Sequence, residues 1–247
     1  MDQISIKFLG SGDNFGSGGR FQTCIYVNSG KSKFLIDCGA SSLIAMKHFG
    51  INPLDIETIL ITHLHGDHFA GLPFFILDSQ LISRRTDPLL IAGPPGLKER
   101  NRSAMEIMFP GSSRTKQKFN INYLELQPNV PVRLGALRVI AAEVIHGSGA
   151  PSYALRVECG AKSIVYTGDT EWTDRLIDLA SGADLLVAES YYYEKKMKNH
   201  LNYKILMERR DELNCKRIIL THMSDDMLQR LDNLEIECAK DGKELIL

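Results

Sequence analysis

The strongest constraint on the fold of this chain is a run of three histidines and one aspartate that directly follows an apolar segment. Residues 58–61 form an apolar, β-patterned run, which is typical of a buried strand, and His63, His65, Asp67 and His68 come next. Imidazole nitrogens and carboxylate oxygens are the usual protein ligands of zinc and similar divalent ions. Four such groups in one short loop cannot all reach one tetrahedral ion, whereas two adjacent ions can share them. The pattern therefore predicts a two-metal site at the end of a strand, and its alternative is a solvated loop rich in histidine.

Three more residues with ligand chemistry follow predicted strands. His146, Asp169 and His222 each come directly after an apolar, β-patterned run. Taken singly, each could be a strand-end cap or a surface residue, because Asp and His are common in turns. Taken together with the histidine-rich run, they complete the ligand shell of two ions at one shared rim.

Three further segments carry chemistry that the residues alone leave open. The glycine-rich segment at residues 10–20 could cradle a phosphate with its backbone N–H groups or could pass close beneath the metal rim, and Arg20 could reach a substrate anion. Asp37, at the end of a predicted strand, either orients a metal ligand or caps the next helix. The basic segment at residues 111–118 either binds phosphate or RNA or is a solvated surface.

The ligand-rich segments resemble, in order and in flanking sequence, the metal-binding motifs of the metallo-β-lactamase superfamily. Residues 8–12 (Phe-Leu-Gly-Ser-Gly), 167–170 (Thr-Gly-Asp-Thr) and 220–224 (Leu-Thr-His-Met-Ser) are most similar to the ribonuclease Z branch and its phosphodiesterase relatives. The resemblance runs over nearly the whole chain. It implies a four-layer αββα sandwich, in which two mixed β-sheets are flanked by helices, whereas periodicity alone indicates only an α/β protein.

The resemblance also implies how the ligands divide between two divalent ions. One ion would be held by His63, His65 and His146. The other would be held by Asp67, His68 and His222, and Asp169 would bridge the two ions. The ions are expected to be zinc, and manganese or iron would suit the same ligand types. A hydroxide bridging the two ions would then be the nucleophile of a hydrolase.

A glutamate and a histidine occur where the ribonuclease Z branch carries its leaving-group acid. By this resemblance His200 would protonate the leaving group, Glu189 would hold His200, and Asp67 would be catalytic as well as a ligand. The chain departs from the branch because it reads His200-Leu201 and Glu189-Ser190 in place of His-Ser/Thr and Glu-Ala. The alternative for His200 is an exposed histidine at the start of a helix.

Two residues are expected to contact the substrate. Arg20 lies in the glycine-rich segment, and Ser224 belongs to the motif that contains His222. Both assignments rest on the resemblance and on the polar chemistry of the two side chains.

The spacing of the motifs bears on the substrate. Members of the branch that process tRNA insert a long basic arm between the fourth histidine ligand and the bridging aspartate, whereas here residues 147–168 hold only a predicted hairpin. The formal net charge of −1 also provides no overall basic field. We therefore predict a dinuclear metal-dependent phosphodiesterase that acts on a nucleotide or a short RNA. The alternatives are a carbonyl hydrolase (lactonase or thioesterase) on the same site and a tRNA 3′-processing ribonuclease Z proper.

The remaining pattern predicts one continuous domain over residues 1–247. A chain of 247 residues with 44% hydrophobic residues can bury a sizeable core. Strands alternate with helices, and the helices are expected at residues 41–49, 69–83, 95–109, 172–181 and 203–213.

Composition also predicts where the protein works. Five scattered cysteines without a CxxC pair are typical of a reducing cytoplasm. No stretch reaches membrane-spanning length and no basic, apolar leader opens the sequence, so we expect a cytoplasmic protein with no membrane partner. Apolar residues near Phe74 and Phe75 could form the surface of a homodimer.

Overall fold

Two β-sheets of seven strands each form the centre of the computed structural model, which describes residues 3–247. From edge to edge, the first sheet contains β14 (Glu244–Ile246), β1 (Ser5–Gly10), β2 (Cys24–Asn28), β3 (Lys33–Ile36), β4 (Thr58–Leu60), β5 (Leu89–Gly93) and β6 (Ile121–Glu125). The second contains β13 (Glu237–Cys238), β12 (Ile218–Thr221), β11 (Leu185–Glu189), β10 (Lys162–Tyr166), β9 (Tyr153–Cys159), β8 (Leu137–Glu143) and β7 (Val132–Leu134).

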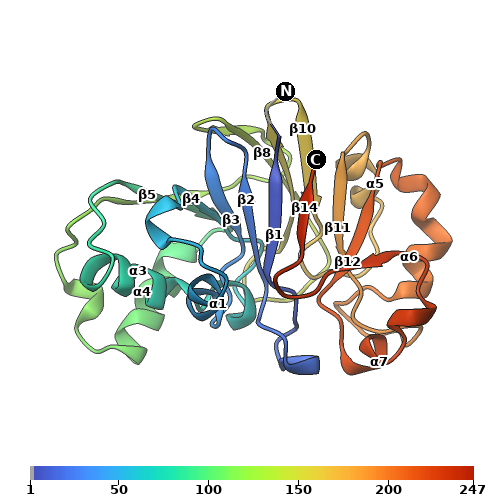
Figure 1. The fold of residues 1–247 in the computed structure, drawn as a ribbon, viewed down its shortest axis with the longest axis horizontal. Coiled ribbons are helices and arrows are strands. Elements are labelled where there is room, and N and C mark those ends of the chain that lie inside the picture. The colour runs from blue at the N-terminus through green and yellow to red at the C-terminus, as the bar shows by residue number, and fades with distance from the viewer. Residues whose placement is uncertain (1–2) are drawn as a thin grey trace.

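Helices cover the outer face of each sheet. The first sheet carries α1 (Ser42–His48), α2 (Gly66–Phe69), α3 (Leu72–Leu81) and α4 (Leu97–Met108). The second carries α5 (Arg175–Ala180), α6 (Tyr203–Arg209) and α7 (Asp225–Leu228). Short 3-10 turns lie at Ser17–Gly19 (η1), Pro53–Asp55 (η2), Ser112–Arg114 (η3), Arg210–Leu213 (η4) and Leu231–Asn233 (η5). Figure 1 shows the resulting order of helices, sheet, sheet and helices, which confirms the predicted αββα sandwich.

Three apolar clusters hold the layers together. The central cluster lies between the sheets and takes side chains from both, such as Phe8 of β1 and Tyr166 of β10. The outer clusters pack each sheet against its own helices, for example through Phe75 of α3 and Leu206 of α6. Truncating a buried Phe to Ala costs about 3–5 kcal/mol, so each layer contact is worth a large part of the net stability. The core shared by both sheets supports our proposal of one domain.

The parallel part of each sheet determines where the loops with ligand chemistry meet. Strands β3 to β6 pair in parallel, and strands β10 to β13 do the same. The remaining neighbours pair antiparallel. Loops that leave the carboxyl ends of parallel strands emerge at one end of a sheet, which is the usual place for ligand binding in α/β folds.

The boundaries differ from the sequence prediction in a few places. The helix expected from residue 69 begins at Leu72, and a separate short helix, α2, ends at Phe69. The helix expected over residues 203–213 ends at Arg209 and continues as a 3-10 turn. Short turns predict a mostly antiparallel run of strands from residue 120 to residue 167, but β6 joins the first sheet beside β5 and is parallel to it.

The two phenylalanines near which an apolar surface was expected are mostly packed within the chain. Phe75 is fully buried in the cluster beneath α3, and the half-buried ring of Phe74 packs edge-on against Phe109 at 5.4 Å. Exposed apolar side chains nearby are Leu81 and Ile82, at the end of α3, and the homodimer stays a prediction. Within residues 3–247, no helix combines the length and the apolar character that crossing a bilayer requires.

Candidate metal centre

The ends of the central strands carry the candidate ligands. His63 lies shortly after β4, Asp169 after β10 and His222 directly after β12. The ligand atoms of three residue groups lie within 4.8 Å of one another: His63, His65 and His146; Asp67, His68, Asp169 and His222; Asp169, Glu189, His200 and His222. The fold thus brings all seven predicted ligands together, and it adds Glu189 and His200 beside them.

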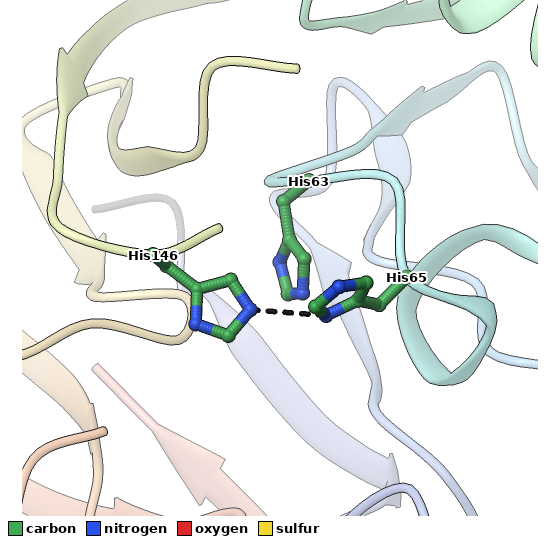
Figure 2. A group of neighbouring side chains, drawn as sticks. All are labelled: His63, His65 and His146. Atoms are coloured by element: carbon green, nitrogen blue, oxygen red, sulfur yellow. Dashed lines mark hydrogen bonds between the residues drawn. The ribbon is translucent and has the colours of Figure 1, made fainter. Parts of the chain in front are cut away.

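The first group is a triangle of imidazoles, which Figure 2 shows. The Nε2 atom of His146 lies 3.0 Å from Nδ1 of His65, and the ring centroids of His63 lie 5.0 Å and 4.6 Å from those of His65 and His146. The backbone carbonyl of Asn199 lies 2.8 Å from Nδ1 of His146. The carbonyl oxygen therefore accepts a hydrogen bond from Nδ1–H of His146, which leaves Nε2 as the ligand nitrogen.

The second group joins a carboxylate to two imidazoles. The Oδ2 atom of Asp67 lies 3.2 Å from Nε2 of His68 and 3.1 Å from Nε2 of His222. The two Nε2 atoms lie 3.3 Å apart. The short distances show that the ligand atoms meet at one point. All three side chains are buried, so this point is shielded from bulk water.

Asp169 lies between the two groups and turns one oxygen toward each. Its Oδ2 atom is 3.8 Å from Nε2 of His63 and 3.9 Å from Nε2 of His146. Its Oδ1 atom is 3.4 Å from Nε2 of His68 and 3.5 Å from Nε2 of His222. This is the geometry of a carboxylate that can bridge two cations.

Buried ligand atoms without a hydrogen-bond partner indicate that these residues fit two divalent ions. Nε2 of His63 and Oδ1 of Asp169 are buried and make no hydrogen bond within the described residues. A buried polar atom without a partner costs about 1–3 kcal/mol, and a cation at the centre of each group would remove that cost. Burial, together with neighbouring His68, also holds the pKa of His63 well below its ordinary value, so its ring is neutral and able to ligate.

A buried carboxylate orients one of the ligands. Oδ2 of Asp37 lies 2.7 Å from Nδ1 of His68, and Oδ1 accepts the Thr62 backbone N–H at 2.8 Å. The Thr62 hydroxyl donates to the same carboxylate. Asp37 therefore holds His68 with Nε2 facing Asp67 and does not cap α1, whose N-cap residue is Ser41.

Glu189 and His200 form a pair at the edge of the cluster. Oε2 of buried Glu189 lies 2.9 Å from Nδ1 of His200, and the His200 ring lies 5.2 Å from that of His146. Burial lowers the pKa of His200, but the bond to Glu189 outweighs it and raises the pKa above its ordinary value. The ring stacks on Tyr191 at 4.7 Å. The contact with Glu189 thus favours the protonated form of His200 beside the ligand groups.

The two predicted substrate contacts are engaged within the protein. Nη1 of Arg20 donates to the Ala239 carbonyl at 2.7 Å and to the Ser11 hydroxyl at 3.3 Å. The hydroxyl of buried Ser224 donates to the Tyr191 carbonyl. Contact of either residue with a substrate stays a prediction.

The glycine-rich segment (residues 10–20) lies beside the centre, whereas the basic segment (residues 111–118) follows α4. In the glycine-rich segment, the Ser11 carbonyl accepts the His222 backbone N–H at 3.1 Å, so the loop passes directly beside the centre, as one of the two readings expected. In the basic segment, Arg114 contacts Glu106 at 3.4 Å and has 76% of its side chain exposed.

Sequence reasoning missed the role of Asn199. Its φ of 72° is a left-handed conformation that asparagine tolerates better than most residues, and Glu171 accepts its backbone N–H at 2.8 Å. This turn places the Asn199 carbonyl on His146 and, one residue later, His200 on Glu189. An asparagine directly before the paired histidine was the available signal.

Comparisons with known proteins agree with a metal-dependent hydrolase. The chain is 28% identical to the ribonuclease Z of Methanothermobacter thermautotrophicus, across 90% of this chain and 87% of that one. The crystal structure of the human short-form tRNase Z superposes with a TM-score of 0.79 and 25% identity, covering 98% of each chain. The metallo-β-lactamase fold protein YhfI of Bacillus subtilis superposes with a TM-score of 0.81 and 20% identity over the full length of both chains, which shows the shared fold.

A family model gives the narrowest placement. The model described as "Anti-Pycsar protein Apyc1" matches residues 4–242, which is nearly the whole chain. The relatives and the clustered His and Asp side chains identify a metal-dependent hydrolase of the metallo-β-lactamase fold, with a ribonuclease Z-like phosphodiesterase or nuclease chemistry. The chain therefore belongs to the family of anti-Pycsar protein Apyc1.

Proposed function

We propose that this protein hydrolyses a small phosphodiester, such as a nucleotide or a short oligonucleotide, at the centre formed by the seven ligands. The observation that carries the proposal is the Glu189–His200 pair beside the two ligand groups. The groups would hold two divalent ions as His63, His65 and His146 on one side and Asp67, His68 and His222 on the other, with Asp169 between them. Bound there, the ions would activate water and neutralise charge on the phosphoryl group.

The chain's own residues account for the remaining step. An alkoxide leaves a phosphodiester readily only if it receives a proton. Glu189 binds Nδ1 of His200, which leaves Nε2 as the ring nitrogen able to give a proton to the departing oxygen. Asp37 and Asn199 act behind the ligands, since each fixes the ring of one histidine.

The first experiment measures metal content and turnover on the same sample. Elemental analysis is paired with hydrolysis of bis(p-nitrophenyl) phosphate and of a simple lactone. About two ions per chain with cleavage of the phosphodiester alone supports the proposal. Cleavage of the lactone alone would favour a carbonyl hydrolase, and a protein that binds no metal would overturn the proposal altogether.

The second experiment tests the proton donor. His200→Ala is expected to slow hydrolysis of a dinucleotide, which has a poor alkoxide leaving group, by about 10²- to 10⁴-fold. Loss on a p-nitrophenyl ester should be much smaller, because p-nitrophenolate leaves without a proton. His48→Ala, which removes an exposed histidine of α1, is the matched control. Equal losses on both substrates would exclude the proposed role of His200.

A tRNA 3′-processing ribonuclease is the second candidate, favoured by the relatives named ribonuclease Z and tRNase Z. The segment between His146 and Asp169 is filled by the β9–β10 hairpin, which lies within the second sheet. Cleavage of a precursor tRNA at a rate comparable to that of a dinucleotide would favour this candidate.

A further inference from the structure

The aromatic ring of Phe15 stands out from the rim of the centre. Its exposed fraction is 80%, although most other Phe residues of the described chain are packed in the core or against it. The ring contributes little to folding, because apolar side chains stabilise a protein only where they are removed from water. Phe15 lies in the glycine-rich segment, which is the deep-blue loop below β1 in Figure 1.

The loop that carries Phe15 is tied down from inside. The buried carboxylate of Asp13 accepts the backbone N–H of Phe15 at 3.2 Å, the backbone N–H of Ser17 at 2.9 Å and the Ser17 hydroxyl at 2.8 Å. Gly16 and Gly18 have φ values of 69° and 63°, which glycine adopts without strain. Phe15 is therefore presented by an ordered turn, so that little entropy would be lost when its ring meets a ligand.

The same loop contacts the centre on two sides. On one side, the Ser11 carbonyl accepts the His222 backbone N–H. Burial and the nearby carboxylate of Asp13 raise the pKa of Tyr191, whose ring stacks on His200. On the other, Gln22 donates to the Asn14 carbonyl at 3.4 Å and packs beside Gly39, which touches the Asp67 backbone. A ligand bound at the centre would thus find the Phe15 loop along its border.

A lysine-rich segment, residues 195–198, borders the same rim. The backbone N–H of Gly18 donates to Asp225 at 3.1 Å and that of Tyr193 donates to Asp226 at 2.9 Å, so the Phe15 loop and residues 191–200 are both fixed to the first turn of α7. Lys195, Lys196 and Lys198 are exposed in this second segment. Exposed aromatic and cationic side chains along one rim are the features with which proteins bind nucleotides without reading a base sequence.

We propose that Phe15 is a stacking platform for the base of a nucleotide bound at the centre. This inference rests on the proposed phosphodiesterase function and names the part of the substrate that the protein recognises. Stacking on an aromatic ring accepts any base, since every base has a π face. Phe15 would thus favour nucleotides over simple phosphodiesters without selecting strongly among bases.

The test compares two esters that share a leaving group. Thymidine 5′-(p-nitrophenyl) phosphate carries a base and methyl p-nitrophenyl phosphate does not. Phe15→Ala is expected to lower kcat/KM for the thymidine ester about tenfold more than for the methyl ester, which is the size of one lost stacking contact. Most of the change should be in KM. Phe15→Trp should restore the preference, and Phe15→Leu, which stays apolar but has no π face, should not.

A binding measurement makes the result independent of turnover. Calorimetry is expected to show that Phe15→Ala weakens binding of thymidine 5′-monophosphate about tenfold more than binding of inorganic phosphate. Ile107→Ala is the control, because Ile107 is 81% exposed on α4 and outside the rim. Equal losses for both ligands, or no loss for either, would overturn the role of Phe15. If the metal-loaded wild type cleaves neither ester, the phosphodiesterase proposal is overturned, and calorimetry still tests the role of Phe15.

Discussion

Replacing Asp37 by Asn tests how the fold prepares a ligand for its ion. Asparagine has the size of aspartate and tolerates the left-handed φ of 60° at this position, so the backbone should remain as it is. The new amide group must face either the Thr62 backbone N–H or Nδ1 of His68, which are both hydrogen-bond donors to Asp37. The backbone N–H cannot change, whereas an imidazole can exchange its tautomer. The amide nitrogen will therefore face His68.

The consequence falls on the opposite side of the His68 ring. Nδ1 must become an acceptor, which moves the proton to Nε2, the atom that lies 3.2 Å from Asp67 and 3.4 Å from Asp169. A protonated Nε2 cannot bind a cation. Loss of an orienting partner of this kind lowers metal affinity by about 10- to 100-fold, which is about 1.4–2.8 kcal/mol.

Competition with a chromophoric chelator measures this affinity for each of the two expected ions. We expect one of them to bind 10- to 100-fold more weakly in Asp37→Asn, and the ion on the side of His63, His65 and His146 to change less. Asp55→Asn removes a partly exposed carboxylate that pairs with Lys33, and it should change neither affinity. Wild-type affinity for both ions in Asp37→Asn would refute the argument that Asp37 selects the His68 tautomer.

Three further outcomes follow from the packing and the charges. Gly39→Ala places a Cβ 2.3 Å from the Asp67 carbonyl oxygen, so both Tm and metal content should fall; an unchanged Tm would contradict this close contact. Burial raises the pKa of Asp184, but the contacts with Lys216 and the Ser163 N–H lower it by more, so the net pKa is below the ordinary value. The charged Asp184 therefore stabilises the folded protein above pH about 3.9, and this stabilisation is lost as the pH falls through the folded pKa. Urea unfolding should show that Asp184→Asn costs about 1 kcal/mol at pH 7, with the gap to the wild type closing below pH about 4. Removing the ions with a chelator should abolish turnover and lower Tm, and adding Zn²⁺ or Mn²⁺ back should restore both.

The sequence predicted those features that depend on local patterning. Apolar runs located the central strands, and His63 to His68 marked the edge at which the loops meet, because ligand chemistry after a strand has few other uses. Residues that act through long-range contacts could not be found this way. The exposure of Phe15 depends on which face of its loop another element covers. The contact of the Asn199 carbonyl with His146 spans 53 positions of the chain, and an asparagine before His200 was its one local signal. Strands β13 and β14 are too short to give a period, and they are held by pairing with β12 and β1.

The position of the β9–β10 hairpin leads to a prediction about substrate size. Both strands pair along their length inside the second sheet, so the segment between His146 and Asp169 supplies no projecting arm that could hold a folded RNA. We expect phosphate contacts to come from exposed residues of the rim such as Lys195 and Lys198. Each phosphate neutralised on a single strand contributes about −0.7 to the slope of log K against log[salt]. We expect a slope shallower than about −3 for a precursor tRNA, measured by fluorescence anisotropy between 50 and 200 mM salt. Lys195→Ala combined with Lys198→Ala should reduce this slope, whereas Arg114→Ala in the basic segment should leave it unchanged. A steeper slope in the wild type, or one that depends on Arg114, would mean that the protein grips RNA over a larger surface than its rim, and the choice of a small phosphodiester as substrate would then have to be abandoned.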